Sequence, residues 1–143
     1  MKVMIFVKAT KGSEDEDFEG QTEMMEEMGR YNEALVAAGI MVDGDGLQPS
    51  SRGKRVVFDG KTRTVKDGPF GGDPNDLVAG FWIWNVKDMN EAVEWVKKCP
   101  NPMATKSEIE IRPFYAMEDL ADHMTPEMIA QEERLREQLG NKH

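Results

Sequence analysis

The sequence predicts an α+β fold of the ferredoxin-like type, in which helices cover one face of an antiparallel sheet. Its 143 residues suggest one domain that is long enough to bury a core. Short apolar runs alternate with helical patterns in the order strand, long helix, strand, hairpin, strand, helix, strand. That order matches a split βαβ arrangement with extra strands in the first crossover. A further helix is expected towards the C-terminus.

The first strand is expected at Lys2 to Lys8. Its odd-numbered positions from Val3 to Val7 are apolar, and so are Met4 and Phe6 between them. Successive side chains of a strand point to opposite faces of the sheet. Both faces of this strand are therefore expected to be covered.

The next stretch, Lys11 to Gly20, is polar and is expected to form a loop. Residues 14–27 hold eight acidic residues and no basic one. A solvated loop that leads into the start of a helix accounts for this charge, because the helix dipole favours acids there. A cation site is the alternative, although the spacing does not match an EF-hand loop.

A helix is expected from about Thr22 to Gly39, because a glycine suits the position after a helix C-terminus. Apolar side chains recur along it at helical spacing, at Met24, Met28, Tyr31, Leu35 and Ala38. Core packing is the interpretation that we favour for this stripe. The adaptability of methionine side chains makes a ligand pocket the alternative.

An irregular strand and a hairpin are expected next. Ile40 to Pro49 contains Gly44-Asp45-Gly46-Leu47, which lacks the residues of a phosphate-binding loop and indicates a bulged strand. Lys54–Phe58 and Thr62–Lys66 are expected to pair around an Asp59-Gly60 turn.

The hairpin is basic in an otherwise acidic chain. Six basic residues and one acidic residue lie between Arg52 and Lys66, whereas the whole chain has a net charge of −9. Such charges are expected to keep an exposed sheet edge from pairing with other chains. The alternative is a lip that attracts an anionic ligand.

The stretch from Asp67 to Pro100 has the most distinctive local pattern. Asp67-Gly68-Pro69-Phe70 combines the residues of a tight turn. Leu77 to Val86 is almost entirely apolar, which predicts a strand covered on both faces. Asp88 has the residue type of a helix N-cap, and the helix is expected to end before Pro100.

The last strand is expected at Glu108 to Pro113, where Glu110 and Arg112 share one face. Two interpretations of this pair stay open. The side chains form an exposed ion pair that contributes little to stability, or they point together into a cavity.

The tail is expected to lie outside the sheet domain. Thr125-Pro126-Glu127 has the residues of a helix start, and Gly140 is a fitting end. The helix carries few apolar residues, so we expect it at the periphery, over its own domain or a partner chain. We therefore assign residues 1–116 to the domain and residues 117–143 to a helical extension.

Composition argues against several classes of protein. A net charge of −9 disfavours general binding to nucleic acid or to an anionic membrane surface. No apolar run approaches the roughly 20 residues that span a bilayer, and MKVMIFVKAT is a poor signal peptide. The single cysteine, Cys99, fits a reducing cytoplasm. We expect no cofactor and no metal site.

Several of these segments resemble a known family. The Asp67-Gly68-Pro69-Phe70 turn, followed by the strand that contains Gly80-Phe81-Trp82-Ile83, is similar to the DGPF-type, YCII-related proteins. Lys8-Ala9-Thr10, Tyr31-Asn32-Glu33 and Gly46-Leu47-Gln48-Pro49 extend the match, which covers residues 1 to about 115. The resemblance implies a dimeric α+β barrel. The apolar second sheet face agrees, because two copies that pack these faces together as a homodimer would cover it.

One departure from the family bears on chemistry. The resemblance implies a His–Asp active site in smaller members, but the histidines here are His123 and His143, both in the tail. The body of the domain therefore lacks an imidazole for general base catalysis or for a metal. Acid–base chemistry would fall to Asp45, Asp67, Glu110 or Tyr31.

We place the candidate site where the DGPF turn meets the inner sheet face. Asp67 and Asp45 are the candidate catalytic residues. Backbone N–H groups of such a turn and arginine side chains bind carboxylates or phosphates. The alternative for Asp67 is structural, with its carboxylate bonded to the backbone of its own turn. The candidate ligand-binding residues are Arg63, Arg112, Gly68, Phe70 and Tyr31.

Three functions are compatible with this pattern. The first is a homodimer that binds a small molecule, with an anion as one candidate, in a pocket by the sheet and the DGPF turn. The second is an isomerase- or lyase-like enzyme that uses carboxylates and arginines, because related dimeric α+β barrels include such enzymes. The third is a protein–protein interaction or regulatory module. A pocket holding Asp67 and an arginine would favour the enzyme, and a closed barrel would favour the module.

Overall fold

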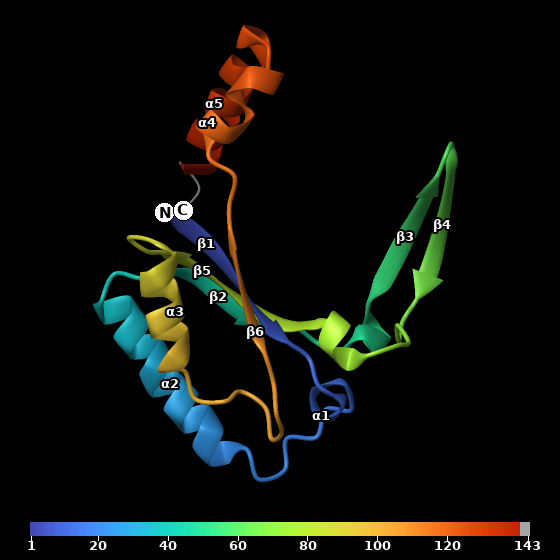
Figure 1. Ribbon diagram of the computed structural model, residues 1–143. Helices are drawn as coiled ribbons and strands as arrows, with labels where there is room; N and C mark the ends of the chain where they lie inside the picture. Colours follow the sequence, from blue (N-terminus) through green and yellow to red (C-terminus); the bar gives the residue numbers. More distant parts are fainter. Residues whose placement is uncertain (141–143) are drawn as a thin grey trace. The chain divides into compact units, whose positions relative to one another are not determined.

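The computed structural model describes residues 1–140, which separate into two compact units (Figure 1). The first unit, Met1–Pro113, contains a four-stranded antiparallel sheet with the order β2-β5-β1-β6. Its strands are β1 (Lys2–Lys8), β2 (Met41–Gly46), β5 (Val78–Asn85) and β6 (Ile109–Pro113). The order is that of a split βαβ domain. The predicted ferredoxin-like α+β fold is therefore confirmed.

Two helices, α2 (Thr22–Ala37) and α3 (Met89–Lys97), lie on the same face of this sheet (Figure 1). The predicted N-cap of α3 is present, because the carboxylate of Asp88 accepts a hydrogen bond from the backbone N–H of Glu91 at 2.9 Å. Each helix turns an apolar stripe towards the strands, as the 3.6-residue period requires.

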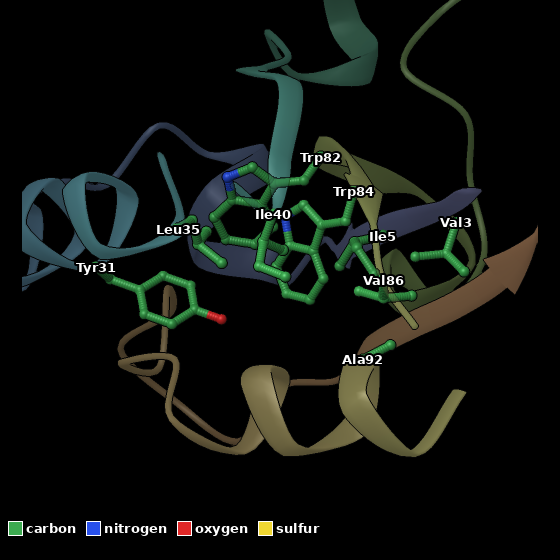
Figure 2. Close-up of a cluster of buried hydrophobic side chains, with 9 residues drawn as sticks. All are labelled: Val3, Ile5, Tyr31, Leu35, Ile40, Trp82, Trp84, Val86 and Ala92. Atoms are coloured by element: carbon green, nitrogen blue, oxygen red, sulfur yellow. The ribbon is translucent and has the colours of Figure 1, made fainter. Parts of the chain in front are cut away.

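The core forms where these stripes meet the sheet (Figure 2). Val3, Ile5, Leu35 and Trp84 are fully buried there, and Ala92 of α3 packs against the same cluster. Burying side chains of this size stabilises a fold by roughly 1.5–3 kcal/mol each. The cluster therefore fixes α2 and α3 to the strands.

The opposite face of the sheet is also apolar, as predicted. Cross-strand register pairs Met4 with Ile83 and Phe6 with Phe81, so these four side chains share that face. All four are half-buried within the single chain. On the other side of β1, Met4 pairs with Arg112 of β6 and Phe6 pairs with Glu110, so these two polar side chains share the same face.

The predicted hairpin forms a separate two-stranded sheet in the connection between β2 and β5 (Figure 1). It consists of β3 (Lys54–Asp59) and β4 (Thr62–Asp67), and all twelve strand residues are exposed. Gly60 in the turn has a φ of 57°, which a glycine adopts without steric cost. The predicted hairpin is confirmed, but its turn lies one residue later than expected, at Gly60-Lys61, because Asp59 ends β3 and pairs with Thr62.

The connections contain structure that the sequence patterns did not predict. The expected loop after β1 begins with a short helix, α1 (Lys11–Glu14). Thr10 caps it through its hydroxyl oxygen, which accepts a hydrogen bond from the N–H of Ser13 at 3.3 Å. Single helical turns also occur as η1 (Ser50–Arg52) and η2 (Pro74–Asp76).

The second unit begins at Phe114 and contains α4 (Met117–Leu120), η3 (Ala121–His123) and α5 (Pro126–Gly140). No side chain of α5 is fully buried. Within residues 1–140, no helix is both long and apolar enough to cross a membrane.

We expect the sheet domain to fold without the tail. A chain truncated after Met117 keeps every strand of the four-stranded sheet and the whole buried cluster, so its thermal unfolding should remain a single cooperative transition. Differential scanning calorimetry tests this expectation. Loss of the cooperative transition would show that the tail completes the domain.

Candidate functional site

The first unit contains a cavity of about 650 Å³. It lies between the first half of α2 and the edge of the sheet formed by β2 and the start of β5. The segment after β1 and the loop Pro102–Thr105 supply the remaining walls. Its volume falls within the range of about 300–1,000 Å³ that is usual for small-molecule sites.

The cavity exists because the apolar stripe of α2 is buried along only half of its length. Tyr31 and Leu35 are buried in the core, whereas Met24 and Met28 are half-buried and line the cavity. The later part of the stripe therefore forms core packing as predicted, and its start lines the cavity, with Met28 also packed against the core cluster. The predicted member Ala38 is exposed.

Much of the wall is apolar and adaptable. Five of the eleven methionines of the chain line the cavity, and aromatic and aliphatic side chains complete the lining. Methionine side chains are flexible and polarizable, so they fit ligands of irregular shape. The cavity-lining methionines are Met24, Met25, Met28, Met41 and Met103.

Three polar groups in the wall are held by identifiable contacts. The indole N–H of Trp82 donates to the amide oxygen of Asn32 at 2.9 Å, which fixes the Asn32 side chain. The hydroxyl of Thr10 donates to the sulfur of Met103 at 3.4 Å. The carboxylate of Asp45 accepts from the N–H of Gly46 at 2.9 Å. A ligand with an apolar body and one or two polar groups suits such a wall.

The charges at the cavity are acidic. Glu14, Glu16, Asp17 and Asp45 line it, and no lysine, arginine or histidine of the described chain does. Arg52 outside the lining binds Glu16 at 2.5 Å, and this hydrogen bond lowers the pKa of the Glu16 carboxyl. Glu16 therefore stays ionised to a lower pH than a glutamate without this partner.

The DGPF turn clamps the base of the hairpin to this acidic wall. The N–H of Gly68 donates to the carbonyl of Gly53 at 3.0 Å, and the N–H of Phe70 donates to the hydroxyl of Ser50 at 3.2 Å. Ser50 in turn donates its own N–H and its hydroxyl to the carboxylate of Glu14. We call this chain of contacts the Ser50 clasp; it joins the turn, η1 and α1.

Gly68 is required by this packing. A Cβ atom at residue 68 would lie 1.7 Å from the carbonyl oxygen of Ser50, far inside the closest contact that two such atoms reach. The glycine of the turn thus lets two backbone segments meet.

The structure distributes the candidate site residues over three places. Asp45 lines the cavity. Asp67 is exposed at the base of the hairpin, where its carboxylate binds Lys54. Arg63 is also on the hairpin, with its guanidinium 4.5 Å from the centre of the Phe58 ring. Arg55 lies 4.0 Å from the centre of the Phe70 ring.

The other candidates lie away from the cavity lining. Arg112 is exposed and binds Glu110 at 3.3 Å, which matches the exposed ion-pair interpretation. Tyr31 is buried in the core, where its hydroxyl donates to the carbonyl of Trp95 at 2.6 Å. Burial raises the pKa of this hydroxyl, so it is a poor acid at neutral pH.

The remaining titratable groups take no part in the cavity. Burial raises the pKa of the Cys99 thiol to about 12, so little reactive thiolate forms at neutral pH. His123 is exposed in the second unit, and His143 lies outside the described residues. Within residues 1–140, no three acidic, histidine or cysteine side chains are placed to hold a metal ion.

Sequence reasoning missed Thr10, Asn32 and Met103 as site residues. Thr10 and Asn32 belong to the Lys8-Ala9-Thr10 and Tyr31-Asn32-Glu33 segments, which carry part of the family resemblance. A signal for both was therefore present. Met103 lies in an irregular loop, and no local pattern marks it.

The close approach at Gly68 predicts a specific loss of stability. Gly68→Ala should reduce the free energy of unfolding by about 1–3 kcal/mol, because the methyl group cannot fit against Ser50. Gly71→Ala is the matched control, since a Cβ atom there meets no other atom within 4 Å. Urea denaturation measures both changes. Equal effects would show that the Gly68 contact is not limiting.

This chain is similar to a known domain family and to a solved structure. The pattern of the YCII-related domain matches residues 1–118. No curated protein matches the chain in sequence. Among solved structures, one similar chain is 5-chloro-2-hydroxyhydroquinone dehydrochlorinase from Burkholderia phenoliruptrix AC1100, in complex with 2,5-dihydroxybenzoquinone. That chain is 16% identical, with a TM-score of 0.45, and the alignment covers 82% of this chain and 98% of that one. Because the domain pattern spans most of its length, this chain belongs to the YCII-related family.

Proposed function

We propose that this protein binds a small molecule with an apolar body, neutral or positively charged, in the cavity between α2 and the sheet. The observation that carries this proposal is the lining itself. It combines a methionine-rich wall with fixed polar groups and contains no basic residue within residues 1–140.

The charge of the wall revises the anionic candidate. A carboxylate or phosphate moved out of water without a partner costs several kcal/mol. The six basic residues between Arg52 and Lys66 that suggested an anion lie outside the lining. A neutral ligand avoids this cost, and an ammonium group would gain from Asp45 or Asp17.

We further propose that the protein acts as a homodimer through the open sheet face. Met4, Phe6, Phe81 and Ile83 form a contiguous apolar row there. Apolar patches of this kind mark interfaces, and a two-fold pair is the commonest solution. A reducing compartment such as the cytoplasm suits a chain whose one cysteine is free.

An enzymatic role is the second candidate, and Asp45 favours it. Asp45 is the one proposed catalytic carboxylate that reaches the cavity, whereas Asp67 is bound to Lys54 on the hairpin. A carboxylate beside a bound apolar molecule can act as a general base. Any such chemistry requires the binding proposed above, so binding is the property to test first.

Three probes with one ring system separate the ligand classes. We expect 2-naphthylmethanol and 2-naphthylmethylammonium to bind at least about tenfold more tightly than 2-naphthoate, because only the carboxylate would be buried without a cationic partner. Isothermal titration calorimetry measures the three dissociation constants. Tighter binding of 2-naphthoate would contradict the proposal.

Two variants of α2 test whether the probe binds in the cavity. Met24→Glu puts a charge into the lining and should weaken the binding of 2-naphthylmethanol by about tenfold. Val36→Glu is its control, because Val36 is 62% exposed on the same helix and outside the lining. The same loss in both variants would locate the probe elsewhere.

The role of Asp45 has a matched control on the same strand. Asp45→Asn should weaken the binding of 2-naphthylmethylammonium by about fivefold, since it removes one nearby charge. It should leave the affinity for 2-naphthylmethanol unchanged. Asp43→Asn should change neither, because Asp43 lies outside the lining although its carboxylate likewise accepts from the following glycine, at 2.8 Å. Equal effects of the two variants would remove Asp45 from the site.

The homodimer predicts a mass in solution. Analytical ultracentrifugation at micromolar concentration should give about twice 16.2 kDa. Phe6→Asp should shift the equilibrium towards the monomer, since it places a charge in the apolar row. A wild-type protein that sediments as a monomer would rule the dimer out.

A further inference from the structure

Both faces of the β3–β4 hairpin, which we call the arm, are exposed within residues 1–140. Its twelve strand residues are all exposed. The DGPF turn and the Ser50 clasp contact it at its base. Isolated two-stranded hairpins are marginally stable in water. An arm of this kind gains stability when another surface covers it.

One face of the arm is apolar at its centre. Cross-strand register pairs Val56 with Val65 and Phe58 with Arg63, and alternate pairs of an antiparallel ladder share a face. Val56, Val65 and Phe58 are 48%, 60% and 71% exposed. Three large apolar side chains side by side at this exposure are typical of the centre of an interface.

The rim of the cavity has the complementary pattern. Phe18, Met25 and Leu47 line the cavity and are each at least half exposed, at 55%, 50% and 52%. Asp17 and Glu19 flank Phe18 in the sequence and are exposed. We call these five residues the cavity rim.

Charge complementarity selects the partner of the arm. Residues 52–66 carry six basic residues and one acidic residue, whereas residues 14–27 carry eight acidic residues and no basic one. The contact between Arg52 and Glu16 at 2.5 Å shows that these two segments already bind each other at the base of the arm. Further along the arm, neither Lys61 nor Arg63 forms an ion pair within residues 1–140, and in the same part of the chain Glu19 forms none.

We propose that the arm of one copy packs on the cavity rim of a second copy, and that each copy thereby closes the ligand cavity of the other. The apolar face of the arm covers Phe18, Met25 and Leu47. Lys61 in the turn and Arg63, which shares the face of Phe58, meet the acids of the rim. In a two-fold pair both contacts form at once. This inference rests on the proposed cavity function and on the homodimer, and it adds a second contact between the copies.

Paired charge reversals test this exchange. The arm variant Lys61→Glu/Arg63→Glu and the rim variant Asp17→Lys/Glu19→Lys each set like charges against each other in a homodimer. Each should raise the dimer dissociation constant at least about tenfold. An equimolar mixture should restore wild-type affinity, because the negative arm then meets the positive rim and the positive arm meets the negative rim. Sedimentation velocity with one fluorescently labelled chain measures this heterodimer.

Controls separate the arm contact from general charge effects and from misfolding. Lys87→Glu/Lys97→Glu changes the net charge as the arm variant does, outside the arm, and should leave the dissociation constant within about twofold of wild type. The substituted arm and rim residues are exposed, so thermal melting should follow the wild type. The affinity for 2-naphthylmethanol should fall in each reversed homodimer and recover in the mixture.

Each remaining outcome has one meaning. If the wild type dimerises and both reversed variants dimerise equally well, the arm does not bind a second copy and the proposal is wrong. If both variants weaken but the mixture does not recover, the arm contacts its own chain, which also overturns the proposal. A monomeric wild type that still binds 2-naphthylmethanol overturns the arm exchange and leaves the cavity function standing.

Discussion

The structure depends on how α2 meets the sheet. One apolar stripe makes this contact, and its later part, at Tyr31 and Leu35, closes a core with Trp84 and Ile5. Its earlier part faces an open space, because the segment after β1 turns into α1 and stands away from the strands as a separate wall. Core packing therefore fixes the position of the helix, and the same helix then carries Met24 and Met28 over the cavity.

The acidic residues of this wall hold the site together. Glu14 and Glu16 are engaged by Ser50 and Arg52, which belong to the connection that leads into the hairpin. Electrostatics and backbone packing thus join three segments that are far apart in the sequence: α1, η1 and the DGPF turn. The turn that carries the family resemblance acts in this chain as a structural clamp for the cavity wall. Its glycine is explained by the close approach to Ser50 rather than by ligand contact.

The fold was predictable from the sequence because each element has a strong local pattern. The apolar run of β5, the Asp88 cap and the Gly60 turn depend on neighbouring residues alone, so they needed no knowledge of tertiary structure. The site was predictable only in part. Asp45 reaches the cavity, but Asp67, Arg63 and Arg112 were grouped by chemistry, and their positions depend on a hairpin that leaves the main sheet and on the pairing of β6. No local pattern determines where such an inserted hairpin points.

The methionines provide the most direct test of the cavity as a ligand site. Five of them line it, whereas Met1, Met4, Met89, Met117, Met124 and Met128 do not. In an NMR titration of protein labelled with ¹³C at the methionine methyl groups, 2-naphthylmethanol should shift the signals of Met24, Met25, Met28, Met41 and Met103 through the ring current of the bound probe. The other six signals should stay in place. Shifts concentrated at Met4 on the open sheet face, with the five cavity signals unchanged, would contradict the account.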